Sequence, residues 1–114
     1  MANRQESGDA ALATALAFHG LAMNGGVLDA VERTSADHVR IDAAFRWLGL
    51  ERIAALLALV RRDVAAGALD DDERAEALER AADERYTAVL PSDAALEAVF
   101  RGRLKEDPSA FACL

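Results

Sequence analysis

The sequence predicts an all-α protein that folds as a single compact domain of about six helices. The chain has 114 residues and 53% of them are hydrophobic, which is enough for one core and too little for two. β-Branched residues are few and aromatic residues make up 5%, so strands are not favoured. Apolar residues also recur at helical spacing between turn residues. We expect the domain to span residues 9–112, after an N-terminal tail of residues 1–8.

The first helix is expected to begin at a cap formed by Ser7 or Asp9 and to run to about residue 23. Helical spacing places four larger residues on one of its faces, namely Leu12, Leu16, His19 and Met23. Nearly all other side chains of this segment are apolar as well. We therefore expect the helix to lie at the centre of the domain.

A pair of glycines interrupts the helical pattern after the first helix. Asn24-Gly25-Gly26 supplies a turn, and a short helix over about residues 27–33 follows it. Because adjacent glycines are poor helix formers, we interpret them as a tight corner that packs the short helix against the first. A helix N-terminus is also a natural anion site. However, no lysine follows and Asp29 and Glu32 would repel a phosphate, so a nucleotide site is not favoured.

The two middle helices have clear apolar faces. Ser35 is expected to cap the third helix, which ends just before Gly49 and carries Ile41, Ala44, Phe45 and Leu48 on its buried side. The fourth helix, over residues 50–66, is closed by Gly67 and has a continuous apolar stripe of Leu50, Ile53, Leu57, Val60 and Val64.

The last segments are identified by their caps. Asp70 and Glu73 have the spacing of a capping box, which predicts a fifth helix that runs to about Leu90. Pro91-Ser92 begins a sixth helix, and Asp107-Pro108 begins a final turn, because proline is tolerated at the first helical position.

Negative charge is concentrated in the fifth helix and the loop before it. The whole chain has a net charge of −7. Residues 70–84 contain two arginines and eight acids, a net charge of −6, and these acids are Asp70, Asp71, Asp72, Glu73, Glu76, Glu79, Asp83 and Glu84. One stripe along the helix is formed by Asp72, Glu76, Glu79 and Asp83, with carboxylates roughly 5 Å apart along the axis. Such a face repels nucleic acid, and it either keeps the protein soluble or binds a basic partner.

Little in the sequence indicates catalysis or metal binding. The two histidines, His19 and His38, are far apart and the single cysteine is Cys113, so we expect no metal site and no cofactor. His19 lies among apolar residues, where we expect a hydrogen-bonded core histidine, with a partner contact or a pH-sensitive role as the alternative. Trp47 is expected to anchor the core or an interface.

The expected location is the cytoplasm. The uncharged run over residues 10–23 has fourteen residues, whereas a membrane span needs roughly twenty. The start of the chain has no pattern of basic residues followed by an apolar run, and one cysteine forms no internal disulfide. We expect no contact with a membrane.

Several short pieces of the sequence occur together in one known family. They are Asn24-Gly25-Gly26, Leu48-Gly49 leading to LERIAALLALV, Asp83-Glu84-Arg85-Tyr86, and SDAALEAVFRGRL with Phe111 after it. In this combination, over about residues 10–112, the chain resembles the DNA-mimic protein family of bacteria, which are small all-helical domains. Members commonly have aromatic residues after the two glycines, whereas this chain has Val27-Leu28-Asp29. The resemblance implies a homodimer whose carboxylates imitate duplex phosphates and occupy the DNA-binding face of a transcription regulator.

We therefore expect a non-enzymatic, acidic interaction protein that binds a basic protein partner, with a DNA-binding regulator as the candidate. The eight acids of residues 70–84 are the predicted contact surface. An immunity or antitoxin protein that neutralises a basic toxin is the alternative. An enzyme or small-molecule binder that uses His19 is a third hypothesis, which requires an apolar pocket around that residue.

Overall fold

The computed structural model describes residues 4–106, and within this range it is all-α and without strands. Six α-helices are joined by short connections, two of which contain a 3-10 turn, η1 (Ser35–Asp37) and η2 (Ala68–Asp70). The helices are α1 (Arg4–Gly25), α2 (Val27–Arg33), α3 (His38–Trp47), α4 (Glu51–Ala65), α5 (Asp72–Val89) and α6 (Asp93–Glu106). The predicted fold class is confirmed.

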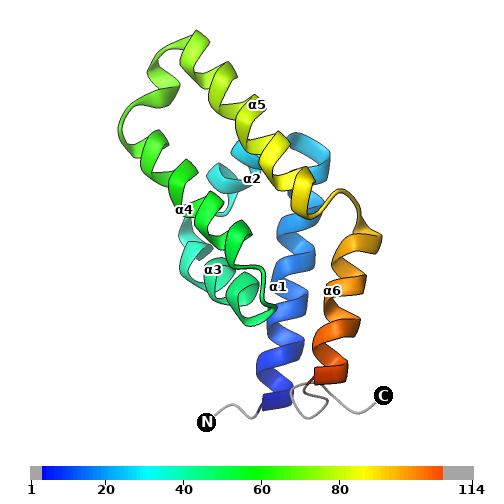
Figure 1. Ribbon diagram of the computed structural model, residues 1–114. Helices are drawn as coiled ribbons and strands as arrows, with labels where there is room; N and C mark the ends of the chain where they lie inside the picture. The colour runs from blue at the N-terminus through cyan, green and yellow to red at the C-terminus, as the bar shows by residue number, and fades with distance from the viewer. Residues whose placement is uncertain (1–3, 107–114) are drawn as a thin grey trace.

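The helices are arranged around α1, and one hairpin extends away from it (Figure 1). α1 packs against α2 and α3, while α6 lies along it and makes fewer contacts. α4 packs on α3, and α5 returns antiparallel to α4 and passes across α2. The molecule is elongated, with extents of 49 × 29 × 20 Å. The end of the α4–α5 hairpin where the acidic residues lie projects from the body.

The core is centred on aromatic residues from three helices. The rings of Phe18 and Phe45 meet edge to face at 5.7 Å, and Tyr86 lies 6.2 Å from Phe18. The predicted stripe of α4 is buried from Leu50 to Val60, whereas Val64 is half-buried. Each fully buried large side chain stabilises the fold by roughly 1.5–3 kcal/mol. These contacts fix α1, α3, α4 and α5 relative to one another.

The start of α1 differs from the prediction. The helix begins at Arg4, so residues 4–8, which were expected to form a tail, are helical. Ser7 and Asp9 lie inside the helix and do not cap its start. The reason is propensity: arginine, glutamine and glutamate at positions 4–6 favour helix, and a capping residue does not oblige a helix to begin beside it.

The buried face of α1 also differs from the prediction. Its core side carries mostly small residues, and the buried side chains are Ala11, Ala15, Phe18, His19 and Ala22. The helix is central, as expected, and His19 of the predicted face is buried, but Leu16 is 42% exposed and Met23 is 44% exposed, so the predicted face is not the buried one as a whole. Alanine side chains let neighbouring helices approach closely, and close packing rather than side-chain size decided which face was buried.

The break between α1 and α2 is a single residue. α1 continues through Asn24 and Gly25, and only Gly26 leaves the helical conformation, with φ 93° and ψ 161°. Glycine adopts this backbone without strain, whereas other residues rarely do. The predicted corner is therefore present, and it is tighter than three residues.

The caps of the later helices correct two predictions. Asp71, not Asp70, caps α5, because its backbone is extended and its side chain accepts a hydrogen bond from the amide of Glu73 at 3.1 Å. Asp70 belongs to η2. Ser35 lies in η1, and α3 begins at His38. Ser92 caps α6 as predicted, with its hydroxyl accepting from the amide of Ala95 at 3.3 Å.

The predicted final turn at Asp107-Pro108, together with Phe111 and Cys113, lies outside the described residues. Among the helices that the structure describes, none combines the length and the apolar character that a bilayer crossing requires.

Gly26→Ala should lower the free energy of unfolding by about 1–3 kcal/mol, because alanine is strained at this backbone conformation. Gly25→Ala is the control, since Gly25 is helical and its new Cβ would meet only the side chain of Asp29, whose Oδ2 would lie 2.5 Å away. Turning that carboxylate away disturbs its exposed pair with Arg33, which costs about 0.5 kcal/mol at most, whereas alanine improves helix propensity by roughly 0.5–1 kcal/mol. We expect a change below about 1 kcal/mol for Gly25→Ala. Urea denaturation followed by circular dichroism measures both, and equal losses would contradict this account.

Candidate functional site

The predicted acidic residues lie on the projecting end of the α4–α5 hairpin, and we call residues 70–84 the acidic arm. In Figure 1 the first half of α5 stands clear of α1 and α6. No side chain of α5 before Ala82 is buried, and Leu78 is half-buried against the core cluster. The arm is therefore held on one side by apolar contacts and is open to solvent on the others.

Seven of the eight predicted acids are exposed, and Asp83 is half-buried. Among residues 10–106, whose side chains are described, none of the eight forms an ion pair with an arginine or lysine, and the pairs present use other acids. Those acids are Asp29, Asp42, Asp93 and Glu106. The negative charge of the arm is thus not neutralised by neighbouring guanidinium groups in the described structure.

Asp83 has a structural role that the sequence did not predict. Its Oδ1 accepts a hydrogen bond at 2.9 Å from the amide of Val27, the first residue of α2. Gly26 occupies the N-cap position of α2 and has no side chain to satisfy that amide. α5 therefore supplies the cap across 56 residues of sequence. A carboxylate of the same chain thus occupies the start of this helix, where a bound phosphate was not favoured.

The backbone conformation of Gly26, rather than a lack of space beside the arm, explains why a side chain is absent there. A Cβ on Gly26 would lie 3.5 Å from both carboxylate oxygens of Asp83 and 3.7 Å from Oε1 of Glu79. These distances are ordinary contacts, so space permits a Cβ, and the left-handed φ of 93° is what disfavours it. The glycine and Asp83 together join α2 to α5.

The charge density of the arm approaches that of a nucleic acid strand. Fifteen residues at the helical rise extend roughly 20 Å. The net charge of −6 over that length corresponds to one charge per ~3.5 Å, whereas one strand of duplex DNA carries one per ~3.4 Å. The charges of the arm are distributed around a helix. The similarity to a DNA strand therefore holds for the total net charge of the arm per unit length, and not for the charges on any one face.

His19 forms a buried polar cluster at the junction of α1, α5 and α6. Its Nδ1 lies 2.8 Å from the hydroxyl of Tyr86, and the two rings stack at 5.8 Å. Its Nε2 lies 3.1 Å from Oδ1 of Asp93, at an angle too oblique for a hydrogen bond. His19 and Tyr86 are each 1% exposed. Burial raises the pKa of the Tyr86 hydroxyl well above its ordinary value.

This cluster has the residue types of a proton relay but no access to a substrate. Both ring groups are buried, and none of the hollows described below includes His19. The prediction of a hydrogen-bonded core histidine is confirmed. His38 is exposed at the start of α3, and its Nδ1 lies 2.9 Å from the carbonyl of Ser35.

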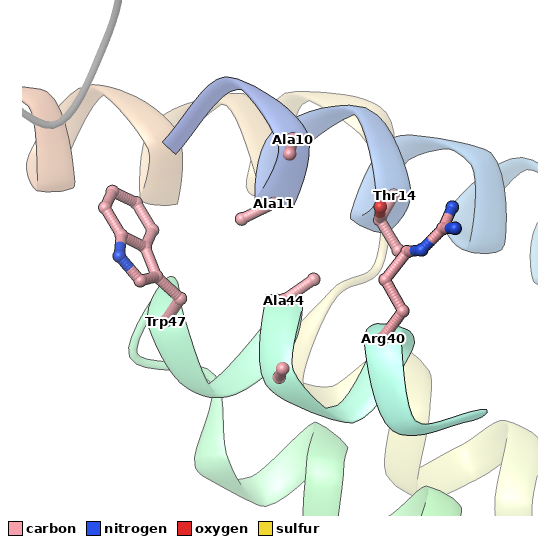
Figure 2. Close-up of a pocket in the computed structure, with 7 residues that line it drawn as sticks. Ala10, Ala11, Thr14, Arg40, Ala44 and Trp47 are labelled. Carbon is pink, nitrogen blue, oxygen red and sulfur yellow. The ribbon is translucent and has the colours of Figure 1, made fainter. Parts of the chain in front are cut away.

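Outside the arm, a hollow of about 290 Å³ lies between α1 and α3, as Figure 2 shows. Ala10 and Ala11 of α1 face Ala44 of α3, with Trp47 at one end and Arg40 at the other. Arg103 of α6 lies 4.7 Å from the centre of the Trp47 ring, so Trp47 is an anchor within the chain. The lining offers one guanidinium and the hydroxyl of Thr14, without a second ionisable group to act as acid or base.

A further hollow lies between α1 and α6, where Leu12 and Leu16 meet Phe100, with Glu97 and Arg101 at its rim. In the part of the chain that the structure describes, no three histidine, cysteine or acidic side chains are grouped so that they could hold a metal ion. The acidic arm therefore remains the feature with the most distinctive chemistry.

Comparison with models of protein families finds no match, and comparison with curated proteins and with solved structures finds none either. The resemblance to the DNA-mimic family rests on the sequence pieces alone.

Asp83→Ala should lower the free energy of unfolding by about 0.5–2 kcal/mol, because the amide of Val27 loses its acceptor. Asp83→Asn keeps an oxygen at the same place and should cost much less. Glu79→Gln is the control, since Glu79 makes no such bond. Chemical denaturation of the three variants measures the effect. Equal losses for alanine and asparagine would contradict the capping role.

Tyr86→Phe should cost about 1–3 kcal/mol of stability, because it leaves Nδ1 of the buried His19 without a partner. The raised pKa of Tyr86 adds a pH dependence. The hydroxyl stays protonated in the folded state after it ionises in the unfolded state near pH 10. Its contribution is complete below that pH and is lost above it by about 1.4 kcal/mol per pH unit.

The difference in stability between the wild type and Tyr86→Phe isolates this contribution from other groups that titrate at high pH. Because the chain has one tyrosine, tyrosinate absorbance follows Tyr86 directly. A midpoint near pH 10 in the folded protein would contradict the sealed environment of the hydroxyl.

Proposed function

We propose that the protein is a non-enzymatic binding protein whose acidic arm docks on a basic protein partner. The observation that carries the proposal is the set of exposed carboxylates that form no ion pair with an arginine or lysine among residues 10–106. A partner's arginines and lysines can pair with these groups without breaking existing ion pairs. Opposite potentials of this kind increase the association rate and the specificity of a complex.

The cost of the cluster supports the same proposal. Acids three or four residues apart on one helix destabilise it by roughly 0.2–0.5 kcal/mol per pair. Glu76, Glu79 and Asp83 have this spacing. A surface needed only for solubility gains nothing from gathering like charges on one arm. Concentrated charge is useful when something binds it.

A DNA-binding regulator is the partner that we favour, with the arm taking the place of duplex phosphates. The net charge of the arm per unit length is close to that of one DNA strand. A duplex has two strands, so our proposal includes a homodimer that presents two arms. Neutralisation of a basic toxin by an immunity or antitoxin protein is the second candidate, because the same exposed acids fit any sufficiently basic surface.

The test compares two triple variants of equal charge change. In the arm variant, three unpaired acids become glutamine: Glu73, Glu76 and Glu79. In the control, three exposed acids outside the arm become glutamine: Glu32, Glu51 and Glu97. Asp71 and Asp83 are left intact because they cap helices. Both variants reduce the net charge from −7 to −4, since each removes three negative charges.

Each immobilised protein is exposed to a lysate of the native host at about 0.1 M and 1 M salt, where the Debye length falls from ~10 to ~3 Å. We expect wild type and the control to retain a basic DNA-binding protein at low salt, and the arm variant to lose it. Duplex DNA should displace the retained protein. If the arm variant retained the basic protein as well as the wild type does, the proposal would be overturned. A retained toxic enzyme that the wild type inhibits, and that DNA does not displace, would establish the second candidate instead.

A further inference from the structure

A second surface, of opposite charge, lies at the other end of the same hairpin. The N-terminal part of α4 and the C-terminal part of α5 enclose a groove of about 420 Å³. We call it the α4–α5 groove, and its lining consists of Arg52, Ala55, Leu56, Leu59, Arg85, Ala88 and Val89. Because the two helices are antiparallel, these residues lie far along the hairpin from the turn that carries Asp70 and Asp71.

The floor of the groove is apolar and its small residues lie at the rim. Leu56 is 8% exposed, and Leu59 and Val89 are half-buried. Ala55 and Ala88 are exposed, one on each helix. Alanine side chains at the rim let another backbone approach the floor. The groove is therefore shaped to receive apolar side chains from outside rather than being filled by its own.

The flanks of the groove are cationic in a protein of net charge −7. Arg52 stands on α4 and Arg85 on α5, and both are exposed. Neither forms an ion pair with any of the side chains described, those of residues 10–106. The adjacent acids Glu51 and Glu84 do not pair with them either, and the residues that line the groove include no acid. One guanidinium group is thus available on each side of the apolar floor.

We propose that the α4–α5 groove binds an acidic amphipathic helix of another protein. The apolar side chains of that helix enter the groove, and its carboxylates pair with Arg52 and Arg85. Recognition of this kind, in which a helix lies in an apolar groove, is common among peptide-binding proteins. Arginine suits the role because its planar guanidinium pairs with a carboxylate through two parallel hydrogen bonds.

The arm of a second copy of this chain fits the groove poorly. The exposed side chains of the arm are carboxylates, two arginines and small residues, without a large apolar group to enter the floor. A different protein with both apolar and acidic side chains matches better. The proposal does not depend on the function of the acidic arm, and it gives the hairpin one binding surface at each end.

The test uses a fluorescent synthetic peptide of about 15–20 residues, long enough to form a helix on binding. It has leucines at helical spacing with glutamates beside them. A scrambled peptide of the same composition and a version with lysine in place of glutamate are the controls. Fluorescence anisotropy should show binding of the acidic amphipathic peptide and no comparable binding of the other two. Absence of binding by the acidic peptide would overturn the proposal.

Variants locate the binding site. Arg52→Gln with Arg85→Gln should weaken binding by about 3- to 30-fold, as expected for two ion pairs at a surface. Arg74→Gln with Arg80→Gln, which removes the same charge from the acidic arm, should not weaken it. Leu59→Glu should weaken it at least about tenfold, because it places a carboxylate at the apolar floor. Circular dichroism confirms that each variant is folded.

Two outcomes separate this proposal from its competitors. The triple arm variant of Glu73, Glu76 and Glu79 should bind the peptide at least as well as the wild type, so failure of the arm proposal leaves this one standing. Equal binding by the wild type and the variant of Arg52 and Arg85 would overturn it. Sedimentation that shows a wild-type dimer and a Leu59→Glu monomer would also overturn it, because a second copy would then occupy the groove.

Discussion

The hydrogen bond between Asp83 and the amide of Val27 links the α4–α5 hairpin to the start of α2, beside the core contacts that hold the helices together. A helix that starts after glycine has exposed amides and no side chain to cap them. Here a carboxylate from α5 caps α2, and the left-handed backbone of Gly26 turns α2 so that its first amide faces that carboxylate. The bond thereby connects the corner after α1 to the base of the acidic arm. Together with the packing of Tyr86 and of the α4 stripe in the core, it orients the two surfaces of the hairpin.

Much of the fold was predictable because it depends on local signals. The α2 bounds, the buried stripe of α4 and the cap of α6 agree with the sequence, since spacing and capping chemistry act within a few residues. The face of α1 was not predictable in this way. Which side of a helix rich in apolar residues is buried depends on its neighbours, and small alanines allowed α3 to approach a face that larger residues did not mark.

The candidate site shows the same division. The location of the acids was visible in the sequence, because the order of residues alone shows where charges are clustered along the chain. The role of Asp83 was not visible, since its partner lies 56 residues away and nothing in the local sequence distinguishes it from Glu79. The α4–α5 groove was missed for a related reason. Arg52 and Arg85 are separated by a whole hairpin, and only antiparallel packing brings them to the two sides of one floor.

α6 differs from the other helices in how it is attached. Leu96 is its buried side chain in the core, while its ends are held by Asp93 beside His19 and by Arg103 on the ring of Trp47. Because α6 makes few contacts with the other helices, we expect it to open locally at a lower free energy than the central helices do. Its detachment would uncover Leu12 and Leu16 of α1 while the contacts among Phe18, Phe45 and Tyr86 stay intact. Amide hydrogen exchange in α6 would then be faster than in the five helices that share the aromatic core.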